Sequence, residues 1–138
     1  MDRGPAINKI SQNIPRIITE EHNQLLLRPV SRQEVDLAMK QLKDGKAPGP
    51  DGFTTTFYHQ FWDLIGEEVW MVVEESRIMH WLLPSLNATF IALIPKEEEA
   101  STPDKYRPIA LCNVIYKVIS QVIANRLKPL LPLLISPE

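Results

Sequence analysis

Two cationic residues, each next to a proline, are the residues of this sequence best suited to binding a charged ligand. Lys96 follows Pro95 and Arg107 precedes Pro108, so a stiff backbone directs each charge. If their segments form the two arms of a β-hairpin, an ammonium and a guanidinium converge at its end. Such a pair can clamp a triphosphate, with one bidentate contact and one point charge. Spacing alone favours the simpler alternative, two solvated charges at a surface turn.

The residues around these cations predict the hairpin. Residues 89–94 are β-branched and apolar, are bounded by Asn87 and Pro95, and are typical of a strand with little exposed surface. Residues 106–111 form the returning strand. The polar stretch 96–105 forms the tip between them.

Two helices are expected in the first third of the chain. Thr19 is a candidate N-cap for a short helix that ends at Arg28. Ser31 and Glu34 have the spacing of a capping box, and Gly45 offers a left-handed C-terminal cap to the same helix. Its apolar stripe consists of Val35, Ala38, Met39 and Leu42.

Two further helices flank the hairpin. A helical period runs from Phe57 towards Met79, with Gly66 as its weak point and Pro84 as its end. Asn113 can cap the last helix, which Pro129 and Pro132 break. The residues of that helix expected to face inward are Ile115, Val118, Ile119 and Val122.

The run Lys-Ala-Pro-Gly-Pro-Asp-Gly at residues 46–52 predicts a rigid, shaped loop. Its prolines fix φ, Gly49 and Gly52 permit positive φ, and Asp51 can cap the segment after it. On physical grounds alone the loop can be a simple connector between helices. An aromatic cluster comes next in the chain, for which core packing is favoured over stacking on bases; its members are Phe53, Phe57, Tyr58, Phe61 and Trp62.

Three runs together resemble the opening of a polymerase domain. They are Lys-Ala-Pro-Gly-Pro-Asp-Gly-Phe at 46–53, Ala-Leu-Ile-Pro-Lys at 92–96 and Tyr-Arg-Pro-Ile-Ala-Leu at 106–111. Their order and separation are similar to those in reverse transcriptases of LINE-type non-LTR retrotransposons, plant ones especially. The resemblance covers residues 25–138 and implies the fingers portion of such an enzyme.

The resemblance implies an α+β fold that is mainly helical with a small antiparallel β-hairpin or sheet. It also implies that Lys96 and Arg107 hold the phosphates of the incoming dNTP, and that the template and primer strands contact three lysines, Lys46, Lys117 and Lys128. The implied partners are an RNA template, a DNA primer and the palm and thumb of the same polypeptide. A surface for nucleic-acid backbone could include Lys105, Arg107, Lys117, Arg126 and Lys128, although a solvated helix face explains the last three equally well.

Reverse transcriptases add nucleotides with two Mg²⁺ ions held by an aspartate strand and a Tyr-x-Asp-Asp hairpin. Neither motif occurs in these 138 residues. We therefore expect no catalytic residue and no bound metal in this chain, with Mg²⁺ belonging to the complete enzyme, and we expect the chain alone not to polymerise. His22, His59 and His80 lie far apart in the sequence, which argues against a zinc site.

Length and composition predict one partial domain. Residues 1–18 are expected to form a loosely ordered arm and residues 19–138 a partial reverse transcriptase domain. The formal net charge is only −2, so a basic site must be local. Cys112 is the single cysteine, which excludes an internal disulfide and suits a reducing compartment. With no membrane span expected, the chain is interpreted as intracellular, in the cytoplasm, the nucleus or both.

Two alternatives stay open at this point. The chain can be a non-catalytic remnant of a decayed retrotransposon, acting at most as a nucleic-acid-binding or interaction module. It can also be a helical protein-interaction module, which predicts no salt-dependent binding of RNA or DNA.

Overall fold

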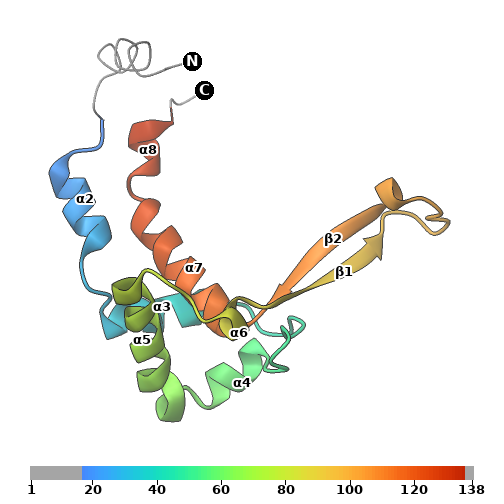
Figure 1. Ribbon diagram of the computed structural model, residues 1–138, viewed down its shortest axis with the longest axis horizontal. Coiled ribbons are helices and arrows are strands. Elements are labelled where there is room, and N and C mark those ends of the chain that lie inside the picture. The colour runs from blue at the N-terminus through green and yellow to red at the C-terminus, as the bar shows by residue number, and fades with distance from the viewer. Residues whose placement is uncertain (1–16, 136–138) are drawn as a thin grey trace. The chain divides into compact units, whose positions relative to one another are not determined.

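The computed structural model describes residues 17–135 and shows an α+β protein, mainly helical with one two-stranded antiparallel sheet, as expected (Figure 1). The expected arm of residues 1–18 lies almost wholly outside the described residues. The elements run in the order α2 (Glu20–Leu27), α3 (Arg32–Gln41), α4 (Thr55–Gln60), α5 (Trp62–Met79), α6 (Pro84–Asn87), β1 (Thr89–Pro95), a 3₁₀ turn (Pro103–Lys105), β2 (Tyr106–Cys112), α7 (Val114–Leu127) and α8 (Leu131–Leu134).

The chain divides into two compact units. One contains the described parts of Met1–Arg28 and Arg126–Glu138, and the other is Pro29–Asn125. In the described residues, no helix is both long enough and apolar enough to cross a membrane.

In the first unit, α2 begins where the sequence predicts. The Thr19 hydroxyl accepts a hydrogen bond from the His22 backbone N–H at 3.3 Å, and the His22 ring accepts one from the Thr19 N–H at 3.2 Å. This reciprocal capping box satisfies two backbone donors that the first turn would otherwise leave free.

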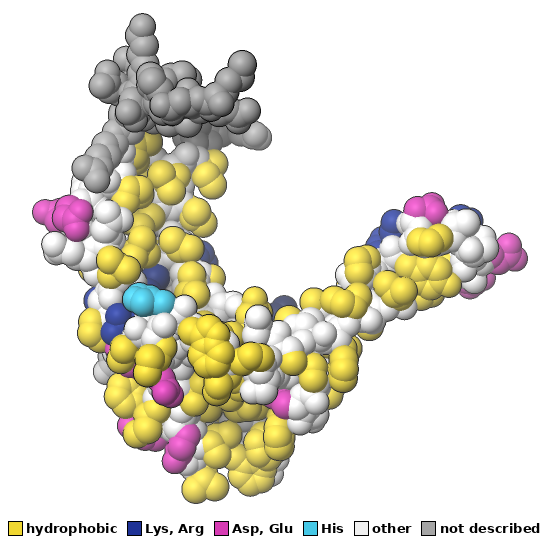
Figure 2. Space-filling model, in the orientation of Figure 1, with side chains coloured by type: hydrophobic (Ala, Val, Ile, Leu, Met, Phe, Trp, Pro, Cys, Tyr) yellow, Lys and Arg dark blue, Asp and Glu magenta, His cyan; other side chains and the backbone are white. Residues whose placement is uncertain are grey.

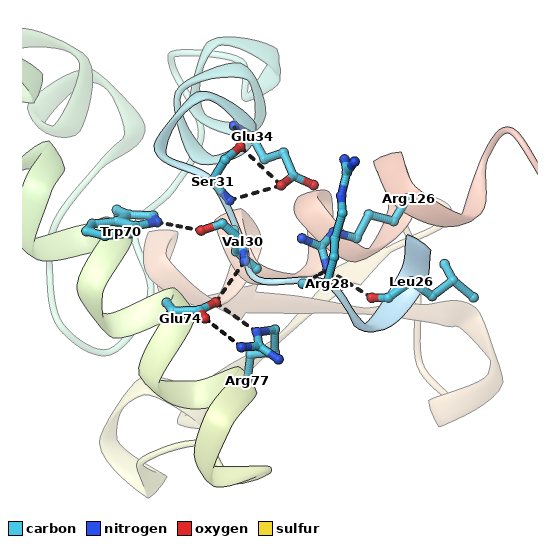
Figure 3. A network of polar contacts seen from close by, with 9 residues as sticks. All are labelled: Leu26, Arg28, Val30, Ser31, Glu34, Trp70, Glu74, Arg77 and Arg126. Atoms are coloured by element: carbon cyan, nitrogen blue, oxygen red, sulfur yellow. Dashed lines mark hydrogen bonds and ion pairs between the residues drawn. The ribbon is translucent and has the colours of Figure 1, made fainter. Parts of the chain in front are cut away.

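Arg126 closes the other end of α2. Its Nη1 atom donates to the backbone oxygens of Leu26, at 2.9 Å, and Arg28, at 2.7 Å (Figure 3). The last carbonyls of a helix carry partial negative charge and lack partners within the helix, so a guanidinium stabilises them. Arg126 thus has a structural role and is not a free member of a nucleic-acid-binding surface.

In the second unit, α3 also carries the predicted capping box. The Ser31 hydroxyl accepts from the Glu34 N–H at 3.3 Å, and the Glu34 carboxylate accepts from the Ser31 N–H at 3.0 Å. The predicted C-terminal cap is wrong, because the helix ends with Leu42 as its cap. Gly45 does adopt a positive φ of 71°, but in the loop beyond the helix.

The predicted helix from Phe57 to Met79 is two helices. Phe61 has φ −106° and ψ 14°, which separates α4 from α5, and α5 ends at His80 in the left-handed conformation. Helix α5 continues through Gly66, where a Cβ would collide with the guanidinium of Arg32. Pro84 begins α6 instead of ending the preceding helix, as its fixed φ allows in a first turn.

Helices α3, α4, α5 and α7 supply the hydrophobic core of the second unit. The predicted inward positions of α3 and α7 are confirmed, since Val35, Met39 and Val118 are at most 1% exposed. Ile115 and Ile119 pack against this core while partly exposed. The buried cluster consists of Val30, Val35, Ala38, Met39, Tyr58, Val69, Val73, Val114, Val118 and Val122.

A polar network ties the start of α3 to α5. Trp70 Nε1 donates to the Val30 oxygen at 2.7 Å, and the Val30 N–H donates to Glu74 Oε2 at 2.8 Å (Figure 3). Arg77 holds the same carboxylate with two bonds of 2.8 and 2.6 Å. Both backbone groups of the buried Val30 are therefore satisfied by α5.

Candidate functional site

The predicted hairpin forms with a register that fixes the positions of its cations. Ile94 lies directly opposite Arg107, and Pro95 opposite Tyr106. The Lys96 N–H donates to the Lys105 oxygen at 2.8 Å, which extends the pairing by one residue beyond β1. The hairpin is confirmed, and its polar tip begins at Lys96.

This register makes Lys96 and Arg107 diagonal neighbours across the two strands. Directly opposite residues share a face of an antiparallel pair, and residues two apart on one strand also share a face. Because Arg107 is opposite Ile94, Lys96 and Arg107 lie on the same face. Sheet geometry separates such diagonal neighbours by roughly 7–8 Å, within reach of one polyphosphate.

Basic and acidic side chains lie beside one another at the far end of the hairpin (Figure 2). Lys96 Nζ donates to the Asp104 backbone oxygen at 2.6 Å, and Lys105 Nζ forms an ion pair of 2.5 Å with Glu97. Within residues 17–135, the Arg107 side chain is exposed and makes no hydrogen bond or ion pair. The far end of the hairpin therefore holds three cations, of which Lys105 is ion-paired with a carboxylate.

The prediction that β1 has little exposed surface is wrong. Phe90, Ile91 and Leu93 are each 59–63% exposed, and six of the seven residues of β1 are exposed. The apolar run predicted a strand correctly, but the two-stranded sheet has no further strand beside it among residues 17–135.

The loop that carries Lys46 contacts the base of the hairpin. Gly49 is buried, and a Cβ at this position would collide with Asn113 and with the backbone carbon of Cys112. Gly52 has the positive φ that the sequence predicts, at 78°, whereas Gly49 is required for close approach and not for φ. Lys46 itself is exposed.

Asn113 joins three segments that are distant in the sequence. Its Oδ1 accepts from the Asp51 N–H at 3.2 Å, and its Nδ2 donates to the Ser85 oxygen at 2.8 Å. The side chain is 1% exposed. Asn113 precedes α7 as predicted, but its side chain bonds to Asp51 and Ser85 instead of capping the helix. The available signal for this role was one amide within the apolar run Leu-Cys-Asn-Val-Ile. Asn113 thus links the 46–52 loop, the end of α6 and the β2–α7 junction.

The other predicted template contacts lie on and after α7. Lys117 is in the first turn of α7, where its N–H donates to the Asn113 oxygen at 3.2 Å, and its side chain is half-buried. The loop of Lys46 and the helix start of Lys117 therefore meet at Asn113. Lys128 follows α7 in the first unit and is exposed.

The aromatic cluster packs in part and is exposed in part. Phe57 lies 4.7 Å from Phe53 and 4.9 Å from Phe61 between ring centres. Phe53 and Phe61 are 45% and 40% exposed, while Tyr58 belongs to the core. Burial, with a smaller effect of the Asp51 charge, raises the pKa of Tyr58 to about 12. Tyr58 is therefore a neutral phenol at physiological pH.

No group of three or more His, Cys, Asp or Glu side chains within residues 17–135 could hold a metal ion. Two of the histidines have structural contacts: the His22 ring caps α2, and His59 contacts the Asp44 carboxylate and the Met39 oxygen, both at 2.9 Å. The described residues therefore do not fit the two-Mg²⁺ chemistry of a polymerase.

A separate groove lies between the end of α5 and α6. Its volume is about 350 Å³, and its one ionisable lining residue is Glu75. A single carboxylate among apolar side chains does not suit a phosphate. The lining residues are Val72, Glu75, Ser76, Met79, Trp81, Leu83 and Leu86.

Known proteins of similar sequence bear on the origin of the chain. No family model matches it. It is 29% identical over 133 residues to the uncharacterized 149 kDa protein of transposon TX1 from Xenopus laevis, covering 96% of this chain and 10% of that protein. These homologues and those below support a retrotransposon origin.

Two further relatives are Pol polyproteins from the type-1 retrotransposable element R2. The one from Bradysia coprophila is 26% identical over 115 residues, which cover 83% of this chain and 12% of the relative. The one from Nasonia vitripennis is 30% identical over 104 residues, or 74% of this chain and 9% of the relative. The chain thus spans about a tenth of the length of the curated relatives it matches.

Proposed function

We propose that this chain is part of the RNA-directed DNA polymerase of a LINE-type non-LTR retrotransposon, where it binds the template and the incoming nucleotide without supplying catalytic carboxylates. The observation that carries the proposal is the placement of Lys96 and Arg107 on one face at the end of the hairpin. The similarity to R2 Pol polyproteins supports it.

At the hairpin, the two cations have complementary tasks. The guanidinium of Arg107 presents a planar fork of donors that matches two phosphate oxygens, and it has no protein partner among residues 17–135. The ammonium of Lys96, now bonded to the Asp104 oxygen, can exchange that neutral acceptor for a charged phosphate oxygen. The proposed ligand is the triphosphate of a dNTP.

The template and primer contacts are proposed for the loop of Lys46 and the start of α7. Gly49 and Asn113 hold this loop against the α7 start, so Lys46 and Lys117 belong to adjoining segments. Lysines in such positions contact phosphates and fix the position of a strand without reading its sequence. Lys128, which is exposed, is proposed as a third contact with the template or primer.

In the complete enzyme, Mg²⁺ would stabilise the charge that develops on the transferred phosphate, and we propose that residues outside this chain hold it. The residues of this chain bind and orient. The same proposal assigns the palm and thumb to the rest of the polypeptide and the site of action to the cytoplasm or nucleus.

A salt titration tests the template contacts. We expect the 138-residue chain to bind an RNA–DNA primer-template in a filter assay, with affinity that falls as salt rises. Replacing Lys46 and Lys117 together by alanine should reduce the slope of log K against log salt by about 1.4–1.8, or 0.7–0.9 per contact. Lys40→Ala, an exposed lysine of α3, is the matched control and should leave the slope unchanged. Binding with no dependence on salt would instead favour a protein-interaction module.

A further inference from the structure

We propose that Lys105 is a third triphosphate-binding cation of the hairpin and that Glu97 competes with the ligand for it. The inference rests on the proposed nucleotide-binding function. It adds to that function one further binding residue, Lys105, and competition by the Glu97 carboxylate. Glu97 would leave Lys105 when a polyphosphate of sufficient charge arrives.

Lys105 lies beside the two cations already proposed to bind the triphosphate. Its backbone oxygen accepts from the Lys96 N–H at 2.8 Å, so the two lysines face each other across the end of the ladder. Arg107 lies two residues further along the same segment. All three cations therefore belong to the last rungs of the hairpin, within the span of one triphosphate.

The ion pair between Lys105 and Glu97 is exposed to solvent and can be displaced. Lys105 Nζ lies 2.5 Å from a Glu97 carboxylate oxygen, and these side chains are 38% and 54% exposed. An ion pair this accessible to water is weak, because solvent screens it and two long side chains lose freedom to form it. A triphosphate offers several anionic oxygens and contacts to two further cations, so it can displace the single carboxylate.

The tip carries two more acids that provide an internal comparison. Glu98 and Glu99 are exposed, and within the described part of the chain neither forms an ion pair. They add negative charge to the same turn, but neither carboxylate is paired with Lys96, Lys105 or Arg107. A ligand with fewer charges gains less from the three cations. Because any ligand of Lys105 has to displace Glu97, the site should bind a triphosphate in preference to a monophosphate.

The test is an isothermal calorimetric titration of the 138-residue chain with dTTP at low ionic strength. Glu97→Gln frees Lys105 and should tighten dTTP binding by about two- to fivefold, while Glu98→Gln makes the same change in net charge and should tighten it less than twofold. Lys105→Met should weaken binding by a similar factor. In the Lys105→Met background, Glu97→Gln should have no more effect than Glu98→Gln, because the cation it would free is absent.

The outcomes separate this inference from the proposed function. If dTTP binds, Arg107→Ala weakens binding, and Glu97→Gln behaves like Glu98→Gln, then Glu97 does not compete and the inference is overturned alone. If dTTP binds equally well without Arg107 and Lys96, or does not bind, both proposals fail. Circular dichroism of each variant checks the fold, which these exposed tip residues should not affect. Retention of the Glu97 effect after loss of Lys105 would also overturn the inference.

Discussion

Gly49 and Asn113, which are distant in the sequence, are packed so closely that a Cβ on the glycine would overlap the asparagine side chain and backbone. This contact joins the two segments that the sequence singled out for binding. The loop of Lys46 and the base of the hairpin that carries Lys96 and Arg107 are thereby parts of one unit.

Gly49→Ala is therefore expected to destabilise the second unit by about 2 kcal/mol or more, since a backbone group has to move to admit the methyl. Urea unfolding followed by Trp fluorescence measures the change. Gly45→Asn is the control, because Gly45 has open space around it and asparagine tolerates its positive φ. Equal stability of Gly49→Ala and the parent chain would show that the close approach is not required.

Asn113→Ala removes the acceptor for Asp51 and the donor for Ser85 at a position that water does not reach. Buried partners left without hydrogen bonds make this change cost about 2–3 kcal/mol of unfolding free energy. Asn87→Ala, at an exposed asparagine of α6, should cost far less. Similar losses for the two variants would contradict the linking role of Asn113.

The contacts of Asp36 make the free energy of unfolding depend on pH. Burial raises the pKa of Asp36, but hydrogen bonds from Arg32 Nε, at 2.9 Å, and Trp62 Nε1, at 2.8 Å, outweigh it and leave the pKa below its ordinary value of 3.8. A carboxyl with a lowered pKa in the folded state contributes stability above pH 3.8, which is lost as the pH falls through the folded value.

Asp36→Asn should therefore lower the free energy of unfolding at about pH 7, relative to the parent chain. It should also reduce the loss of that free energy between about pH 5 and about pH 3. Urea unfolding at each pH measures both effects. Glu68→Gln, at an exposed position of α5, should leave the pH profile unchanged. A profile for Asp36→Asn that runs parallel to the parent would contradict the argument.

Arg126→Gln should loosen the end of α2 without affecting the second unit. The guanidinium holds the Leu26 and Arg28 oxygens, so amide hydrogen exchange in the last turn of α2 should become faster. Exchange in α3 and α5 should stay the same. Lys128→Gln, a nearby exposed cation, should change neither. Unchanged exchange in α2 would remove the capping role of Arg126.

Signals within a few residues of sequence predicted the local structure well. The N-cap at Thr19, the capping box at Ser31 and the presence of the hairpin follow from residue types within short segments, which the sequence displays directly. The break at Phe61 did not follow, because the apolar period continues through it.

Features set by distant contacts were not predictable in the same way. The reason for Gly49 depends on where Asn113 lies, and the use of Arg126 depends on the fold returning to α2. The Glu97 and Lys105 pair spans the hairpin tip, and its formation depends on the register found only in the structure. Residue type identified the candidate cations, while three-dimensional packing determined which of them have protein partners.

The most direct test of the central claim is the nucleotide kinetics of Arg107→Ala in a complete reverse transcriptase that carries this segment, with Lys40→Ala as the control. We expect KM for dTTP to rise, or kcat to fall, by about tenfold or more, because a charged phosphate contact is lost. The control should match the parent enzyme. Kinetics for Arg107→Ala that equal those of the parent would show that the hairpin cations do not hold the nucleotide phosphates.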